Sequence, residues 1–252
     1  MGSLIVHRDG PLLSLQLANP GKANALDLEM LAALDEQVTR INEDESVRLV
    51  LLRGTPGGCF SSGADIREWA PMTAEAFGRD WIGHGNAVFR RFERLRCPTV
   101  AVIEGLCFGG GLELALCADM RVASTAARLR FPEVAIGAIP GWEGGPRLAR
   151  LAGRGRALEA VLTSREIDAA TGERWGVLNA VWPTEGFESR LAQWLAPLTQ
   201  VSPQAAAIAK ALIVDDEADP AIAYPAAGQA IKSSLDADIG IRAFFDKKTA
   251  VF

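Results

Sequence analysis

The segment Thr99–Asp119 constrains the fold more than any other stretch of this 252-residue chain. It opens with the apolar run Thr99–Ile103, which is long enough for one buried strand, and it then passes through the glycine triplet 109–111. The apolar residues over 112–118 are typical of a buried helix. The sequence therefore predicts a strand, a glycine turn and a helix in succession, which is a building unit of α/β folds.

The same turn is a candidate site. A strand that leads through glycines into a helix presents free backbone N–H groups at the positive end of the helix dipole, where negative charge on a bound oxygen is stabilised. Glu113 is a carboxylate in the first turn of this otherwise apolar helix. A second glycine-rich loop, 54–65, follows the expected strand Val47–Leu52 and also leads toward a helix. Two converging N–H groups would form an oxyanion hole, in which each donor contributes ~3–4 kcal/mol.

The sequence supports other functions of these glycines less well. A dinucleotide-binding turn needs a third glycine where Leu114 stands, and no Gly-Lys-Ser/Thr sequence completes a phosphate-binding loop. Glycine before a helix also serves packing alone. That structural interpretation stays open for each loop considered by itself.

Composition narrows the chemistry. A net charge of −5 argues against a nucleic-acid partner, which requires a basic surface. The four cysteines have no CxxC spacing, so we expect neither a metal site nor disulfides. The only histidines, His7 and His84, are expected to be structural, which leaves carboxylates as the acid–base candidates. No apolar run reaches the ~18–20 residues of a membrane helix and no signal peptide is evident, so we expect a cytoplasmic protein without membrane contact.

The hydrophobic pattern divides the chain in two. Strands and helices alternate over 1–182, beginning with a hairpin around Asp9–Pro11, whereas residues 183–252 are almost entirely helical. We expect an α/β core with the site, followed by a helical region for packing or oligomerisation. The segment between the short helix at 66–69 and Gly85 is expected to be mobile surface structure.

Several motifs together resemble the crotonase family, also called the enoyl-CoA hydratase/isomerase family, and its hydratases most closely. They are Phe60-Ser-Ser-Gly-Ala-Asp-Ile66, Glu104-Gly-Leu-Cys-Phe-Gly-Gly-Gly-Leu-Glu-Leu114, Phe131-Pro-Glu133 and Ile139-Pro-Gly141. The loop Lys22–Leu26 and the tail Phe245–Lys248 resemble the coenzyme A contacts of the same family. The similarity runs in register over essentially the whole chain.

The resemblance implies a fold, an assembly and a substrate class. The implied fold is a spiral of β-β-α units followed by a C-terminal helical trimerisation region, which agrees with the two-part pattern above. The implied assembly is a homotrimer or a dimer of trimers. Coenzyme A would enter as part of an acyl-CoA thioester substrate, and no permanently bound cofactor is expected.

The resemblance also assigns roles to individual positions. Glu113 and Glu133 match the two catalytic glutamates of hydratases, and Ala64 and Gly110 match the two N–H donors to the thioester carbonyl. Gly141 falls where a backbone N–H helps to place the catalytic water. The positions that would line the coenzyme A and acyl path are Lys22, Ala23, Ala25, Asp65, Ile66 and Arg67, and Lys248 is a candidate for binding a phosphate of coenzyme A.

The implied reaction is hydration of a 2-enoyl-CoA to a 3-hydroxyacyl-CoA. Enolate charge would build on the thioester oxygen, where two N–H groups stabilise it. Two carboxyl groups around one water would exchange the protons, and their proximity would move their pKa values apart. Each glutamate also has a structural interpretation, Glu113 as a charge at a helix start and Glu133 as a surface charge.

The chain departs from the hydratase pattern after Gly141. Small residues and glycines are usual there, whereas this chain has Trp142 and Glu143 beside the expected acyl pocket. Glu143 either faces solvent or caps the following helix in a remodelled pocket, or it is a third acid that reaches the acyl group. A double-bond isomerase, an acyl-CoA hydrolase and a non-catalytic acyl-CoA-binding scaffold therefore remain alternatives to a hydratase.

Overall fold

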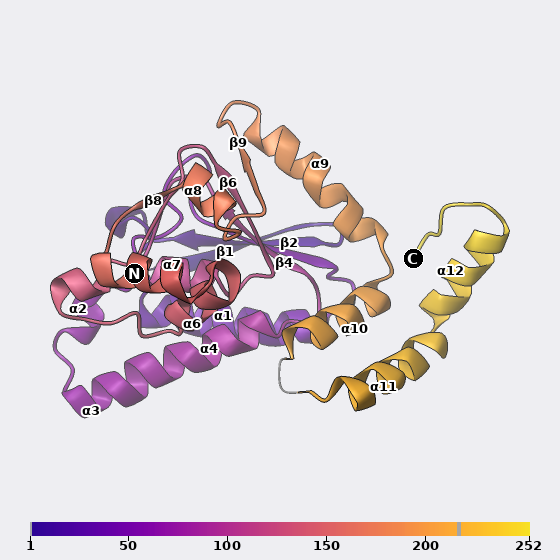
Figure 1. The fold of residues 1–252 in the computed structure, drawn as a ribbon, viewed down its shortest axis with the longest axis horizontal. Coiled ribbons are helices and arrows are strands. Elements are labelled where there is room, and N and C mark those ends of the chain that lie inside the picture. Colours follow the sequence, from indigo (N-terminus) through magenta and orange to yellow (C-terminus); the bar gives the residue numbers. More distant parts are fainter. Residues whose placement is uncertain (1, 216–217) are drawn as a thin grey trace.

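The computed structural model describes residues 2–215 and 218–252, in which two sheets form the centre of the fold (Figure 1). The main sheet has the order β1-β2-β3-β4-β6-β9, and its neighbours pair in parallel except in the antiparallel β1–β2 hairpin. Its strands are β1 (Ser3–Asp9), β2 (Leu12–Ala18), β3 (Leu49–Arg53), β4 (Thr99–Ile103), β6 (Met120–Ser124) and β9 (Ala180–Trp182). The second sheet has the order β5-β7-β8, with β5 (Leu106–Phe108), β7 (Arg128–Arg130) and β8 (Ile167–Asp168).

The inner strands are continuously apolar because both faces of the main sheet are covered. In β3, Val50 and Leu52 belong to the large core that contains the apolar side of α1 (Leu28–Glu43). Leu49 and Leu51 point to the opposite face, where they pack in a second cluster with α9 (Phe187–Gln200). Successive side chains of a strand alternate between faces, so one apolar run supplies both cores.

The remaining helices surround the sheets and then continue as a C-terminal arm. The helices of the body are α2 (Ile66–Trp69), α3 (Ala74–Ala76), α4 (His84–Glu93), α5 (Gly110–Ala115), α6 (Gly144–Ala152), α7 (Arg154–Thr163) and α8 (Ala169–Arg174). Figure 1 shows that α9, α10 (Pro203–Val214), α11 (Pro220–Lys232) and α12 (Leu235–Phe245) extend to one side of the body. The α/β fold with a helical C-terminal part is confirmed. Among the described residues, no helix is both long and apolar enough to cross a membrane.

The segment before Gly85, expected to be mobile surface structure, is helical from residue 74 onward. Residues 74–83 form α3 followed by a π-helical turn, Phe77–Gly83, which leads directly into α4. Trp81 in this turn is only 2% exposed. The mixed polar pattern of the segment arises because one side faces solvent while Trp81 anchors the other in the core. The flanking Gly83 and Gly85 favour a loop at His84, but His84 is the first residue of α4.

The second sheet was not expected from the sequence. Its strands contain only two or three residues each, which is too short for a periodic pattern to indicate them. The apolar run Val177–Val181 by itself predicts a strand, but the strand β9 begins only at Ala180. Val177 and Leu178 are buried without belonging to a strand, which explains their apolar character.

Candidate active site

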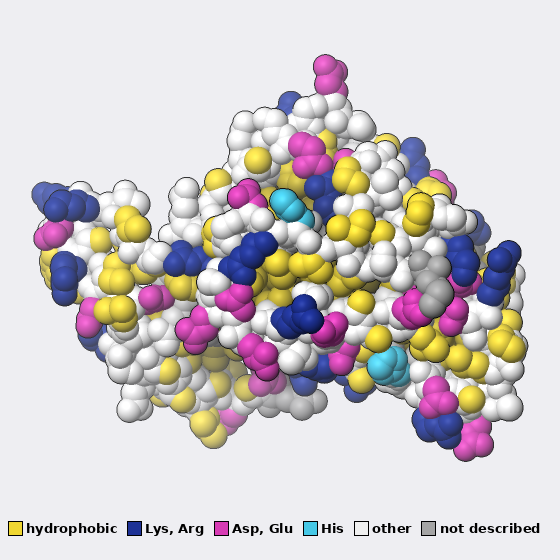
Figure 2. All heavy atoms as spheres, turned by 180° about the vertical axis from the view of Figure 1, so that it is seen from behind, with side chains coloured by type: hydrophobic (Ala, Val, Ile, Leu, Met, Phe, Trp, Pro, Cys, Tyr) yellow, Lys and Arg dark blue, Asp and Glu magenta, His cyan; other side chains and the backbone are white. Residues whose placement is uncertain are grey.

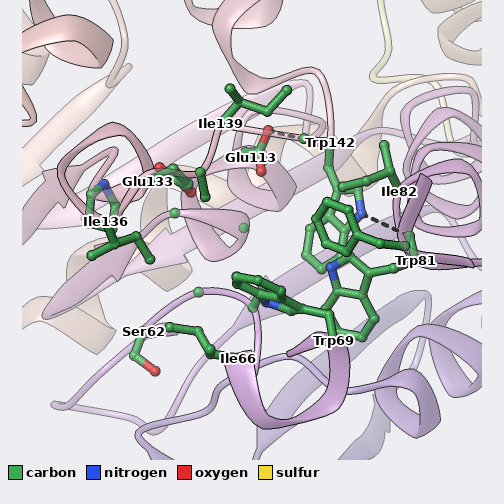
Figure 3. A pocket seen from close by; sticks show the side chains of 18 residues that line it. Ser62, Ile66, Trp69, Trp81, Ile82, Glu113, Glu133, Ile136, Ile139 and Trp142 are labelled. Carbon is green, nitrogen blue, oxygen red and sulfur yellow. Dashed lines mark hydrogen bonds between the residues drawn. The ribbon is translucent and has the colours of Figure 1, made fainter. Parts of the chain in front are cut away.

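Pairing between two short strands brings the two predicted glutamates to one place. β5 runs parallel to β7, and the N–H of Gly109, directly after β5, donates to the carbonyl of Arg130 at the end of β7. Glu113 lies in the helix that follows β5, and Glu133 lies in a 3-10 turn shortly after β7. Because the carboxyl ends of parallel strands meet at one edge of a sheet, both side chains reach the same cavity (Figure 3).

Two backbone N–H groups at this edge are free to bind an oxygen. The backbone of Ala64 bridges Leu26 through the carbonyl of Gly63 and the N–H of Asp65, which leaves the N–H of Ala64 unused. Gly110 is the first residue of α5, where N–H groups have no partner within the helix. Neither N–H has an acceptor within residues 2–215 and 218–252. Both residues line the cavity, so the pair can act as an oxyanion hole.

The carboxyl group of Glu113 is buried and held from one side. Its Oε1 atom accepts the backbone N–H of Trp142 at 2.8 Å and that of Gly144 at 2.9 Å. The residue is 2% exposed, and a Cβ at position 144 would lie 2.5 Å from the Cγ atom of Glu113. Glycine at 144 therefore makes room for the acid, and the second carboxyl oxygen is left for a ligand.

Glu133 approaches the cavity from the opposite loop. Its Oε2 atom is buried without a hydrogen-bond partner among the described residues. A Cβ on Gly109 would lie 2.6 Å from its Oε1 atom, and Gly109 has a φ of +48°. Glycine at 109 therefore satisfies both a left-handed turn and the close approach of this carboxyl group. A buried, unpartnered carboxyl oxygen that faces a cavity is a binding position for water or a polar ligand.

Burial keeps both acids unusually weak. Desolvation raises the pKa of Glu113 from 4.5 to about 8, against the opposing effect of its two N–H donors, and the nearby charge of Glu133 adds to the rise. Desolvation also raises the pKa of Glu133 to about 7. The two groups therefore share protons near neutral pH, which is the state in which one can accept a proton while the other donates one.

The cavity has an apolar wall opposite the acids. Its volume is about 90 Å³, and Figure 3 shows the two glutamates facing a group of aromatic and aliphatic side chains. The apolar lining consists of Ile66, Trp69, Phe77, Trp81, Ile82, Ile136, Ile139 and Trp142. Polar groups on one side and hydrocarbon on the other suit a small molecule with a reactive polar group and an apolar chain.

Glu143 does not reach the cavity. Its carboxylate binds both the guanidinium of Arg90 and, at 3.4 Å, that of Arg147. The hydrogen bond from Arg90 is the main reason that the pKa of Glu143 is lowered. The residue has a φ of +65° and precedes α6 without capping it by its side chain. The geometry thus favours a structural ion pair over a third acid at the acyl group.

The expected coenzyme A residues occupy two places. Lys22 pairs with Asp65, which also caps α2 through the N–H of Arg67. The loop Ala23–Ala25 is tied to the second glycine loop because the side chain of Asn24 donates to the carbonyl of Cys59 at 2.8 Å. Of these predicted positions, only Ile66 lines the cavity itself. Lys248 lies beyond α12, where its Nζ atom is 3.9 Å from the Oδ2 atom of Asp246.

The sequence offers Trp69, Trp81, Phe89 and Trp142 either as the lining of an aromatic pocket or as plain packing. Trp69, Trp81 and Trp142 line the cavity, whereas Phe89 packs behind it against the ring of Trp142. Two residues around the site were missed by sequence reasoning, Asn86 and Arg147. The side chain of Asn86 donates to the carbonyl of Gly141 at 3.1 Å. Arg147, 3% exposed, donates to the carbonyl of Trp142 at 2.7 Å. The only available signal was an arginine within the apolar pattern of α6. Within the described residues, no group of three or more His, Cys, Asp or Glu could hold a metal ion.

Comparison with known proteins places this geometry in a family. The model of the enoyl-CoA hydratase/isomerase family matches residues 8–252. A short-chain-enoyl-CoA hydratase of Clostridium acetobutylicum is 36% identical over 181 residues, which cover 72% of this chain and 69% of that protein. A probable enoyl-CoA hydratase of Mycobacterium tuberculosis is 32% identical over 209 residues, covering 82% and 79% of the two chains.

The three-dimensional similarity extends over almost the whole chain. The crystal structure of an enoyl-CoA hydratase from Bacillus anthracis superposes with a TM-score of 0.92 at 30% identity, covering 99% of this chain and 98% of that one. The match includes the C-terminal helices as well as the sheets. This chain belongs to the enoyl-CoA hydratase/isomerase family, the crotonase family, and has its fold.

Proposed function

We propose that this enzyme adds water to a 2-enoyl-CoA and forms a 3-hydroxyacyl-CoA. The observation that carries the proposal is one cavity that combines two free N–H groups, from Ala64 and Gly110, with two buried acids, Glu113 and Glu133. An isomerase needs only one acid to move a proton between carbons. A reaction that must both activate water and protonate carbon makes use of two.

The thioester carbonyl oxygen would lie between the N–H groups of Ala64 and Gly110. Attack of water at the β-carbon turns the enoyl thioester into an enolate, so negative charge grows on that oxygen as the new carbon–oxygen bond forms. The N–H groups are fixed by the backbone before the reaction begins, and therefore they stabilise the enolate more than the neutral ground state. The start of α5 adds its positive dipole end to the same oxygen.

The two glutamates would balance the protons of the reaction. The water loses one proton to a carboxylate as its oxygen bonds to the β-carbon, and the other, protonated carboxyl delivers a proton to the α-carbon. The net change is addition of H and OH across the double bond. Gly141 lines the same cavity, where we infer that its N–H helps to place the water. The singly protonated glutamate pair is the reactive form.

We further propose that coenzyme A binds over the two loops that meet at the Lys22–Asp65 ion pair. Lys22 and Arg67 offer cations to its phosphates. Lys248 follows α12, which lies at the opposite end of the molecule from α2, so within one chain it does not join them (Figure 1). Ala23 and Ala25 would flank the path together with Ile66. Substitution of Lys22 by methionine should weaken binding of free coenzyme A severalfold, measured by calorimetry, and unchanged affinity would remove this loop from the proposed path.

The assembly and location are also proposals. The arm exposes large apolar side chains, among them Ile222, Leu235, Phe244 and Phe245, and hydrophobic side chains are visible on it at the left of Figure 2. Exposed apolar surface of this kind favours association. We infer a homotrimer or a dimer of trimers in the cytoplasm. Light scattering should give a multiple of three protomers, and a stable monomer would contradict this.

Substitution of the glutamates tests the proposed reaction. Glu113→Gln and Glu133→Gln keep the size of each side chain but remove its proton exchange, so each should lower kcat for crotonyl-CoA hydration by about 10²–10⁴. Products would be identified by mass over a panel of enoyl-CoA thioesters. Near-normal hydration by either variant would contradict the assignment, and release of free coenzyme A or migration of the double bond would favour a hydrolase or an isomerase.

A further inference from the structure

The cavity has an open end and a closed end. Ile66, Ile136 and Ile139 line it with exposures of 48%, 58% and 71%, so they stand at the mouth. Trp81 and Trp142 line it with exposures of 2% and 1%, so they stand at the inner end. A substrate that enters at the mouth with its apolar chain foremost therefore meets a wall of two indole rings.

The ring of Trp142 is fixed in this wall. Its Nε1 atom donates to the backbone carbonyl of Trp81 at 3.2 Å, and its ring packs against those of Trp81 and Phe89 with centroids 5.3 and 5.1 Å away. Position 85 is a glycine whose Cβ would overlap the indole nitrogen. The hydrogen bond and the close packing hold one rotamer, so the ring cannot swing aside at low cost.

The same ring lies next to the proposed oxyanion hole. A Cβ on Gly110 would stand 2.5 Å from the Cζ3 atom of Trp142 and 3.3 Å from the backbone nitrogen of Ala64. The indole edge and the two N–H donors therefore border one small space. An acyl chain whose carbonyl oxygen is held by these donors has only a short path before it reaches the ring.

We propose that Trp142 sets an upper limit on acyl length and restricts this enzyme to short acyl groups of about four carbons. The cavity volume of about 90 Å³ is smaller than the ~150 Å³ of an engineered apolar cavity that accommodates benzene. A chain of eight carbons is larger than benzene and does not fit without displacing the indole. The proposal rests on the proposed function because it takes an acyl-CoA as the ligand.

A second pair of aromatic rings in the cavity, Trp69 and Phe77, is the alternative determinant of acyl length. Trp69 and Phe77 also line the cavity, but both are partly exposed and belong to α2 and the π-helical turn near the mouth. Their rings pack against each other at 5.2 Å. If they set the chain length, removal of Trp69 should extend the accepted length more than removal of Trp142.

Calorimetric binding of butyryl-CoA and octanoyl-CoA tests the proposal without requiring turnover. The wild type should bind butyryl-CoA more tightly. Trp142→Ala should raise the affinity for octanoyl-CoA relative to butyryl-CoA by at least ~10-fold. The reason is that the additional methylene groups of the octanoyl chain can then occupy the apolar space that the indole ring fills in the wild type. Trp69→Ala should change this ratio much less. Trp194→Ala, which removes a tryptophan from α9 outside the cavity, should leave the ratio unchanged.

Three results would overturn the inference: a wild type that binds octanoyl-CoA as tightly as butyryl-CoA, a folded Trp142→Ala protein with an unchanged ratio, or a larger gain from Trp69→Ala. If Trp142→Ala does not fold, Trp142→Phe provides the same comparison with a smaller expected gain. Hydration of crotonyl-CoA measured in parallel separates the two proposals. If the wild type prefers butyryl-CoA but does not hydrate crotonyl-CoA, only the proposed reaction is contradicted. If it hydrates crotonyl-CoA but Trp142→Ala leaves the binding ratio unchanged, only the chain-length assignment is contradicted.

Discussion

The Oε1 atom of Glu113 accepts the backbone N–H of Trp142 at 2.8 Å. Through this bond, the residue that closes the inner end of the cavity also fixes the orientation of one acid. The carbonyl of Trp142 is held in turn by the buried guanidinium of Arg147 at 2.7 Å. Pocket shape and acid placement therefore depend on one peptide segment, and changes in that segment should affect both.

Activity should have a bell-shaped pH dependence. Below the pKa of about 7 for Glu133 both acids are protonated and no base remains, whereas above the pKa of about 8 for Glu113 both are ionised and no acid remains. The kcat/KM for crotonyl-CoA should be greatest between about pH 7 and 8. Stopped-time assays of crotonyl-CoA hydration from about pH 5 to 10 would show this maximum. A profile that stays flat from about pH 5 to 10 would be incompatible with the singly protonated pair.

Stability should fall as the pH rises through the same region. The folded state raises the pKa of Glu113 from 4.5 to about 8, so between these values the native protein binds a proton that the unfolded chain has released. The free energy of unfolding then decreases with pH across this window and levels off above about 8. The effect is at most about 5 kcal/mol for this group.

Chemical denaturation of the wild type and of Glu113→Gln would isolate this contribution. The glutamine cannot ionise, so the variant should gain stability relative to the wild type between about pH 5 and 8. Only the difference between the two curves is interpreted, because all groups except Glu113 and its charge-coupled neighbour Glu133 titrate equally in both. If the free energy of unfolding of the two proteins changes in parallel with pH, the pKa of Glu113 is not raised by burial in the folded state.

Gly110→Ala should be destabilising through a defined clash. The new Cβ would lie 2.5 Å from the Cζ3 atom of Trp142, and overpacking of this kind costs about 1–3 kcal/mol. Gly145→Ala is the matched control, because a Cβ there meets nothing within 4 Å and alanine is the better helix former. Combining Gly110→Ala with Trp142→Ala should relieve the clash, so the two effects on unfolding should be strongly non-additive. Simple additivity would show that the ring does not contact position 110.

Arg147→Met should impair both stability and catalysis. Removing this 3% exposed guanidinium leaves Glu93 without its buried partner and frees the carbonyl of Trp142, at a cost of about 3–5 kcal/mol. The N–H groups on Glu113 would then be less well placed, which should lower kcat and shift the basic limb of the pH profile. Arg150→Met removes an exposed partner of the same Glu93 and should cost no more than about 1 kcal/mol. Equal effects of the two substitutions would refute a positioning role for Arg147.

The sequence by itself determined the fold class and much of the local structure. The apolar run Thr99–Ile103 forms a buried strand and the glycine triplet opens α5, as the pattern predicts. Asp27 caps α1 through the N–H of Met30, a local contact that the residue types indicate. Such features depend on neighbours a few residues away, and therefore they can be read from the order of the residues. The family resemblance carried the prediction further, to Glu113 and Glu133.

Only the tertiary structure decided how distant segments meet. Pairing of the three-residue strands β5 and β7 sets the two glutamates on one cavity, and strands so short leave no periodic signal. Glu143 turned away to Arg90 and Arg147, although its place in the sequence was equally suited to the acyl group. Trp142 closes the cavity because Trp81, far from it in the chain, supplies its hydrogen-bond acceptor. Burial, ion pairing and pocket volume depend on contacts between remote residues, so the packed chain alone fixes them.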